Sequence, residues 1–161
     1  MSRMLIAGLL CLSLMACSSE DAAERAADED KAARLVEQAS ELIQEREYQA
    51  AVAPMTDAIA LAPANTEYQL LRCFLLERTG TALAETKRCY TDVVDLFSKA
   101  PDRPCNQDMN CVIASLMAES DQAEATRTAF LEEPASQAEL EVRRYVLEGF
   151  NRQAYLNTLF P

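Results

Sequence analysis

Apolar residues along most of this chain recur three and four positions apart, which places them on one face of a helix. The pattern predicts a first helix that ends near residues 45–47 and further helices over 48–61, 66–78, 82–99, 108–119, 122–132 and 136–159. Turn residues such as Pro63, Gly80 and Pro134 separate these segments. Because the connections are short, neighbouring helices should be antiparallel. We therefore expect an all-α fold of stacked antiparallel hairpins, with the last helix closing the stack.

The first sixteen residues have a different pattern, in which a continuous apolar run follows one positive residue. Arg3 precedes the run from Met4 to Ala16, in which Ser13 is the one polar interruption. The run is too short for a membrane-spanning helix, which needs about 20 residues, but it suits a secretory signal. It ends in Leu14-Met15-Ala16-Cys17, which resembles the lipobox of bacterial lipoproteins. The resemblance implies cleavage before Cys17 and lipidation of Cys17, and an ordinary secretory signal is the alternative.

A strongly acidic segment follows the lipobox. Residues 18–30 carry six acidic side chains against a single arginine, Arg25. Self-repulsion among like charges favours an extended, solvated tether over a recognition motif. The chain thus divides into a signal peptide (1–16), a lipidated acidic tether (17–30) and one helical domain (31–161). Because Ser18, and not aspartate, follows the lipobox, the resemblance to lipoproteins implies an anchor in the outer membrane, with the domain facing the periplasm.

Composition excludes several classes of function. The formal charge of −11, from 26 acidic and 15 basic residues, disfavours a nucleic-acid binder, which needs a cationic face. The absence of histidine excludes imidazole bases and histidine metal ligands. The closely spaced carboxylates Asp92 and Asp95, and likewise Glu41 and Glu45, lie on amphipathic helices and are expected to be solvated. No enzyme activity, cofactor or small-molecule substrate is predicted.

Residues 32–65 carry a family resemblance. Leu35, Ala39, Ala51, Ala58 and Pro63 fall at the positions of a tetratricopeptide (TPR) repeat. The small residues allow two helix backbones to approach closely, and the proline ends the second helix. The later hairpins match the family pattern less well, and a generic helical bundle is the alternative to a short TPR-like solenoid.

The resemblance to TPR repeats implies a surface for a protein partner. In that family the first helix of each hairpin lines a concave groove that holds a peptide or a helix. The matching positions lie on two helices of this chain and are Ala33, Val36, Ser40, Ile43, Gln44, Glu67, Leu70, Phe74, Glu77 and Arg78. Leu70 and Phe74 equally suit core positions. The C-terminal helix is expected either to fill this groove or to cap the stack.

Four cysteines remain in the predicted helical domain. An even number of cysteines in a small exported domain indicates disulfides. Cys73 and Cys89 are centred on the turn at Gly80, so they should face each other across a hairpin, which leaves Cys105 and Cys111 to close a loop. A zinc site is disfavoured because no two cysteines are separated by only two residues. Asp102, Asn106 and Asp108 lack the spacing of a calcium-binding EF-hand loop.

The combined pattern predicts an outer-membrane-anchored periplasmic adaptor or scaffold. Its partner would be a protein of an envelope assembly, such as a pilus, a secretion system or an outer-membrane assembly machine. The alternative is a small disulfide-stapled helical lipoprotein that acts as an inhibitor, an immunity factor or a structural envelope component. The alternative predicts binding through an exposed convex surface or through the loop between Cys105 and Cys111, and not through the groove.

Overall fold

The computed structural model describes residues 14–99 and 104–161, with side chains described from residue 21 onward. Within these ranges the chain contains only helices and connecting segments, so the predicted all-α fold is confirmed. The helices are α1 (Leu14–Gln44), α2 (Tyr48–Leu61), α3 (Thr66–Arg78), α4 (Leu83–Ser98), the 3-10 helix η1 (Cys105–Gln107), α5 (Met109–Ala118), α6 (Ala123–Glu132), α7 (Gln137–Leu147) and α8 (Arg152–Leu159). The predicted signal peptide lies outside the described residues, apart from the backbone of residues 14–16, and so does the side chain of Cys17.

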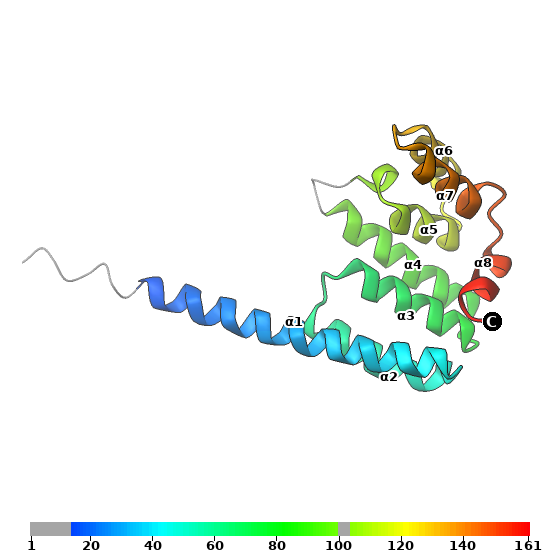
Figure 1. Ribbon diagram of the computed structural model, residues 1–161. Coiled ribbons are helices and arrows are strands. Elements are labelled where there is room, and N and C mark those ends of the chain that lie inside the picture. The colour runs from blue at the N-terminus through cyan, green and yellow to red at the C-terminus, as the bar shows by residue number, and fades with distance from the viewer. Residues whose placement is uncertain (1–13, 100–103) are drawn as a thin grey trace, which may run out of the picture.

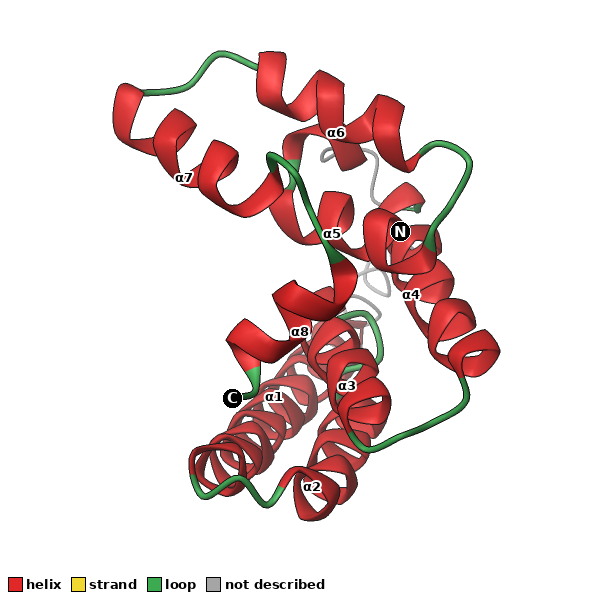
Figure 2. Cartoon of the chain, turned by 90° about the vertical axis from the view of Figure 1, so that its right-hand side faces the viewer, coloured by secondary structure: helices red, strands yellow, loops and turns green. Residues whose placement is uncertain are grey.

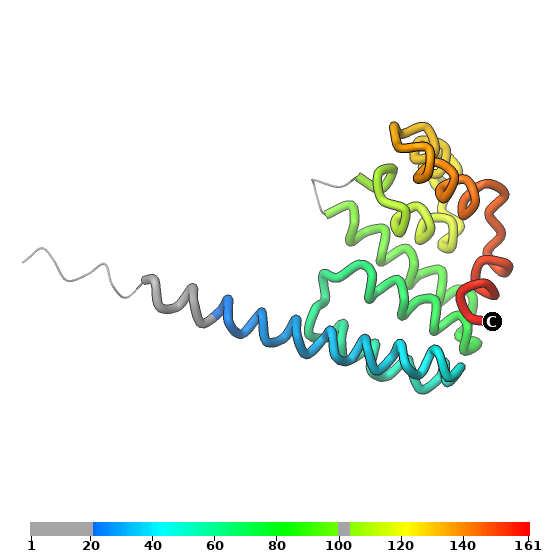
Figure 3. The backbone as a smooth tube through the Cα atoms, in the orientation of Figure 1, coloured from blue at the N-terminus to red at the C-terminus, as the bar shows by residue number. Residues whose placement is uncertain are grey.

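The acidic segment forms the projecting end of a long helix. The first part of α1 extends away from the stacked hairpins (Figures 1 and 3), and Ala32 is the first fully buried residue along the described part of this helix. The expectation of an extended chain is therefore wrong for residues 21–30, which are helical. Frequent alanine and glutamate favour a helix, and the packed turns after Ala32 supply a nucleus from which the helix continues at little cost. Among the described residues, no helix combines the length and the apolar character needed to cross a membrane.

Small side chains hold the first hairpin together. Ala39 of α1 and Ala51 and Ala58 of α2 are completely buried, so the two helices approach closely along this line. The turn between them begins at Arg46, which takes a left-handed conformation with φ of 63°. The amide of Arg46 donates to the carbonyl of Ile43 and that of Glu47 to the carbonyl of Leu42, which is a Schellman motif.

The second and third hairpins repeat this arrangement around a central buried helix. Asn65 caps α3 by accepting hydrogen bonds from two backbone amides, and Gly80, with φ of 88°, ends the turn that follows this helix. Every residue of α5 from Cys111 to Ala118 is buried. A helix that is buried on all sides needs neighbours all round, and α5 lies among α3, α4 and α6. The hairpins thus stack on one continuous core.

The C-terminal region differs from the prediction. A single helix was expected over residues 136–159, but the structure has two helices, α7 and α8, with a bend between Leu147 and Arg152. Gly149 has φ of 69°, a conformation that glycine adopts without steric cost. Asn151 then caps α8 by accepting a hydrogen bond from the amide of Ala154. The bend turns α8 back across the hairpins, where it lies beside α3 (Figure 2).

Candidate functional site

A groove runs along the helices that the TPR resemblance assigns to partner binding. Its volume is about 470 Å³. One wall comes from Ser40, Ile43 and Gln44 of α1 and from Glu67, Leu70, Leu71 and Phe74 of α3, Asn110 of α5 lies at one edge, and Tyr155, Leu159 and Phe160 close the other side. We call this cavity the α1–α3 groove. Its lining is mostly apolar, with an acid and two amides among the polar groups.

Six of the ten residues predicted to line a groove do so: Ser40, Ile43, Gln44, Glu67, Leu70 and Phe74. Leu70 and Phe74 also belong to the core, with 4% and 6% of their surfaces exposed. The sequence left open whether these two residues line the groove or belong to the core, and in the structure they do both. Among the described residues, Ala33 and Val36 do not contribute to the lining. For all ten residues, a role in binding a partner stays a prediction.

The remaining two predicted residues contact the C-terminal segment or its neighbours. Glu77 forms an ion pair with Arg152, the first residue of α8. The guanidinium of Arg78 lies over the ring of Tyr48, at 5.2 Å from its centre. Part of the surface expected to bind a partner is therefore occupied by the chain itself.

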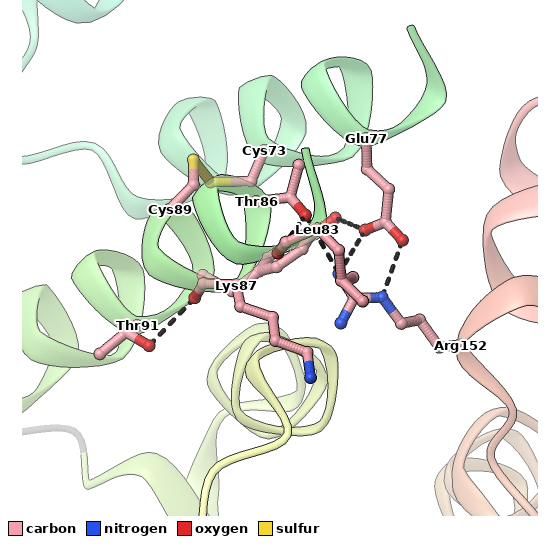
Figure 4. Close-up of a disulfide and its surroundings, with 9 residues drawn as sticks. Cys73, Glu77, Leu83, Thr86, Lys87, Cys89, Thr91 and Arg152 are labelled. Carbon is pink, nitrogen blue, oxygen red and sulfur yellow. Dashed lines mark hydrogen bonds and ion pairs between the residues drawn. A yellow bond between two sulfur atoms is a disulfide. The ribbon is translucent and has the colours of Figure 1, made fainter. Parts of the chain in front are cut away.

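Arg152 fixes the start of α8 through a network of hydrogen bonds (Figure 4). Its Nε donates to Oε1 of Glu77 at 2.7 Å and its Nη2 donates to Oε2 at 2.9 Å. The guanidinium also donates to Oγ1 of the buried Thr86 at 3.3 Å, to Oε1 of Glu119 at 3.4 Å and to the backbone carbonyl of Met117. The helices α3, α4 and α5, the last together with the residue that follows it, thus contribute hydrogen-bond acceptors to one guanidinium group.

Burial and charge determine the protonation of this cluster. The hydroxyl of Tyr90 donates to Oε2 of Glu77 at 2.8 Å. Burial raises the pKa of Tyr90, and the adjacent carboxylate of Glu77 raises it further. Burial opposes the charge on Arg152, but the hydrogen bonds and the charge of Glu77 outweigh it and raise the pKa of the guanidinium. A hydrogen bond from Lys87, at 2.5 Å, lowers the pKa of Glu119.

Aromatic rings continue the contact along α8. The ring of Tyr155 lies 5.8 Å from that of Phe74 and 5.3 Å from that of Phe150. At the far end, Phe160 is almost fully buried and meets the ring of Tyr48 edge-on at 5.4 Å. The hydroxyl of Tyr48 donates to the carbonyl of Pro161 at 2.8 Å. The helix is therefore attached at both of its ends.

Sequence reasoning did not identify Arg152 as a residue of this site. The signal was nonetheless present, because Gly149 and Asn151 are typical of a helix end followed by a new helix start. Arg152 then precedes apolar residues three, four and eight positions later, which is the pattern of a short amphipathic helix. Its acceptor Glu77 lies 75 positions away. No local pattern relates residues so far apart.

Both disulfides expected from the sequence are present. Cys73 of α3 is bonded to Cys89 of α4, with the Cα atoms 5.7 Å apart (Figure 4). Cys105 is bonded to Cys111, with the Cα atoms 5.1 Å apart, which ties η1 to the first turn of α5. The first disulfide lies one helical turn from Glu77 and next to Tyr90, so it fixes α3 and α4 where Arg152 binds.

A second, larger groove lies beside the Cys105–Cys111 loop. Its volume is about 680 Å³, and its lining consists of Gln107, Asp108, Met109, Asn110, Phe130, Ala138, Glu139, Val142 and Arg143. We call it the α5–α7 groove. Asn110 lines both grooves, so the two cavities adjoin at the start of α5.

The carboxylates that the sequence grouped in pairs are exposed, namely Asp92 and Asp95 on α4 and Glu41 and Glu45 at the end of α1. Among the described side chains there is no cluster of three or more potential metal ligands.

Comparisons of the chain with protein-family models, with curated proteins and with solved structures find no match.

Proposed function

We propose that this protein is a lipid-anchored adaptor of the bacterial cell envelope. Cys17 attaches it to the outer membrane, and the helical domain faces the periplasm. The α1–α3 groove binds a protein of an envelope assembly. The observation that carries the proposal is that six residues chosen from the spacing of one repeat and its neighbour line a single groove. The two disulfides support it, since disulfides persist in an oxidising compartment outside the cytoplasm.

The groove has the character of a binding surface. Glu67 and Gln44 are exposed at its rim, while Leu70 and Phe74 form its floor. An apolar floor with a few polar groups at the rim is typical of grooves that take a peptide or a helix. The projecting part of α1 would hold this surface away from the membrane.

Site-specific photocrosslinking in cells tests the binding surface. A photoreactive residue at position 44 or 67 should give one discrete crosslinked species, whose partner is then identified by mass spectrometry. The same residue at position 57, on the exposed side of α2, is the matched control and should give none. The species should disappear when Ile43→Glu changes the groove in a chain that remains folded by circular dichroism. Equal crosslinking from all three positions would refute the proposal.

Membrane fractionation tests the anchor separately. Cys17→Ala should release the protein into the soluble fraction, because no acyl chains are added. Cys11→Ala is the matched control, since Cys11 lies inside the predicted signal peptide and should not affect fractionation. Membrane association that survives Cys17→Ala would remove the lipid anchor from the proposal.

One observation favours a second candidate function. The Cys105–Cys111 loop contributes Gln107 to the α5–α7 groove, and Val142 in the same groove is 55% exposed. An inhibitor or immunity factor that binds through this loop should crosslink from positions 107 and 142. Crosslinks from these two positions, with none from 44 and 67, would favour this second function over the adaptor.

A further inference from the structure

Helix α8 lies in the partner surface as a ligand would. Its first residue is a cation, and its apolar side chains follow at three, four and eight positions: Tyr155, Leu156 and Phe160. Leu156 and Phe160, the residue that follows α8, are 3% and 2% exposed, and Tyr155 is partly buried against the core. The opposite face carries Gln153, Asn157 and Thr158, which are exposed. The segment is thus a short amphipathic helix that packs on the hairpins and forms one wall of the α1–α3 groove.

The receiving surface is chemically suited to a cation. The carboxylates of Glu77 and Glu119, the carbonyl of Met117 and the hydroxyl of Thr86 all accept hydrogen bonds from the guanidinium of Arg152. Only 13% of the Glu77 side chain is exposed. A buried carboxylate that loses its cation is strongly destabilised. Any helix that occupies this place therefore has to supply a positive charge at the same position.

Noncovalent contacts attach α8 to the hairpins. Both disulfides join other elements, so no covalent crosslink holds α8 against the hairpins. Its connection to α7 passes through Gly149, where a Cβ atom would meet no neighbouring heavy atom within 4 Å. The space beside Gly149 is therefore open, whereas the next residue, Phe150, packs against the core. Hydrogen bonds and side-chain packing, including the contact of Phe150 with Tyr155, are what hold the helix in place.

Open groove surface adjoins the seated helix. Tyr155, Leu159 and Phe160 of the α8 segment form one wall of the α1–α3 groove, and 39% of the Leu159 side chain is exposed. An incoming segment can therefore contact the apolar floor around Leu70 and Leu71 before α8 leaves. The surface beside α8 and the surface beneath it are continuous.

We propose that the partner presents an amphipathic helix that repeats the pattern of the α8 segment and that this helix binds by displacing α8. The pattern is a basic residue followed by apolar residues three, four and eight positions later. This inference rests on the proposed function, because it names the partner and the regulation of the same groove. In this arrangement α8 is an internal competitor. It occupies the site around Glu77 while the partner is absent. It therefore reduces the apparent affinity in proportion to the fraction of molecules in which this site is free.

A peptide-binding experiment on the full chain tests this proposal. The probe is a fluorescein-labelled synthetic peptide with the sequence of residues 150–161, titrated into the oxidised wild-type protein and into the Arg152→Ala variant. In the variant the internal helix has lost its cation, so the peptide should bind at least about tenfold more tightly than to the wild type. A peptide that itself carries Arg152→Ala should bind at least about tenfold more weakly than the unmodified peptide. Glu77→Gln in the receiving protein should weaken binding of the unmodified peptide.

A second variant keeps the test informative if Arg152→Ala does not fold. Phe160→Ser releases the opposite end of α8 and leaves the Glu77 site intact, so it should also bind the peptide more tightly than the wild type. Equal affinity of the peptide for the wild type and for both folded variants would overturn the proposal, as would equal affinity of the two peptides. A variant that forms a dimer in light scattering and excludes the peptide would identify a second copy as the occupant, which also overturns it.

The outcome separates this inference from the function on which it rests. If the crosslinks from positions 44 and 67 are absent, the proposed function is refuted. If those crosslinks persist in cells but neither variant binds the peptide, the displacement of α8 is refuted and the adaptor function stands.

Discussion

Arg152 of α8 and Glu77 of α3 form a pair of parallel hydrogen bonds, at 2.7 and 2.9 Å, across 75 positions of sequence. Both side chains are largely buried, with 15% and 13% of their surfaces exposed. Planar two-point contacts of this kind fix direction as well as distance. The pair therefore fixes the first residue of α8 on α3.

Loss of this pair should destabilise the protein measurably. Arg152→Ala leaves the Glu77 carboxylate with the Tyr90 hydroxyl as its remaining donor among the described contacts, so we expect a loss of about 2–3 kcal/mol in the free energy of unfolding. Urea unfolding with a double-mutant cycle through Glu77→Leu should isolate the coupling, and the double variant should recover part of the loss. The matched control is Lys87→Ala, because the Lys87–Glu119 pair is more exposed and should contribute less than about 1 kcal/mol. Equal losses in the two single variants would contradict the prediction.

The two disulfides should contribute unequally to stability. The Cys73–Cys89 bond closes a separation of 16 residues and the Cys105–Cys111 bond a separation of 6. If the bonds act mainly on the entropy of the unfolded chain, their loss should cost about 3 and about 2 kcal/mol respectively. Thermal unfolding of the Cys73→Ala/Cys89→Ala and Cys105→Ala/Cys111→Ala variants gives this comparison.

Alkylation followed by intact-mass measurement checks that the bonds are formed. None of the four cysteines of the helical domain should react before reduction, and all four should react after reduction and unfolding. A free thiol at Cys73 or Cys89 in the native protein would contradict the pairing.

Stability should fall in alkaline solution because of two tyrosines. Burial raises the pKa of Tyr90, with Glu77 adding to it, and burial raises that of Tyr155. Below about pH 10, the usual tyrosine pKa, both folded and unfolded chains hold these protons and stability is unaffected. Above it the unfolded chain loses protons that the folded protein retains, so the free energy of unfolding decreases as the pH rises.

Tyrosine titration followed by ultraviolet absorbance checks this behaviour. Tyr90 and Tyr155 should ionise above the usual tyrosine pKa. Tyr90→Phe and Tyr155→Phe should each flatten the alkaline slope of stability. Ionisation of Tyr90 and Tyr155 at the usual tyrosine pKa would contradict the prediction.

The contact between α1 and α2 should not tolerate larger side chains. Ala51 is fully buried against α1, so Ala51→Leu forces side chains or backbone to move and should cost about 1–3 kcal/mol. Ala53→Leu lies on the exposed side of the same helix and should change stability by less than about 0.5 kcal/mol. Chemical denaturation of the two variants provides the comparison, and similar midpoints would show that this contact is loosely packed.

Local patterns predicted most of the hairpins correctly. The bounds expected for α2 and α3, Tyr48–Leu61 and Thr66–Arg78, are those of the structure. Helix ends are determined by nearby residues, such as the cap at Asn65 and the glycine turn at Gly80, which are visible in sequence. The Cys73–Cys89 disulfide was predictable for the same reason, because the two cysteines are equidistant from a hairpin turn and can face each other across it. The Cys105–Cys111 disulfide was then the remaining pair.

The acidic segment and the C-terminal helix were predicted less well. For residues 21–30 the expectation weighed charge repulsion but not the helix propensity of alanine and glutamate or the packed helix that follows. For residues 136–159 the apolar spacing continues across Gly149, so periodicity alone favours one helix. The cap at Asn151 was the competing signal.

The sequence by itself determined the all-α class, the bounds of α2 and α3 and the two disulfides, because each depends on residues close together along the chain. Through the resemblance to TPR repeats it also indicated six of the residues that line the α1–α3 groove. The tertiary structure decided that α8 turns back and closes one side of that groove. This depends on Arg152 meeting Glu77 and Glu119, and on Phe160 meeting Tyr48, contacts between segments that no short-range pattern relates. These contacts require the stacked hairpins, because Glu77, Thr86 and Glu119, which accept hydrogen bonds from Arg152, belong to different hairpins or helices.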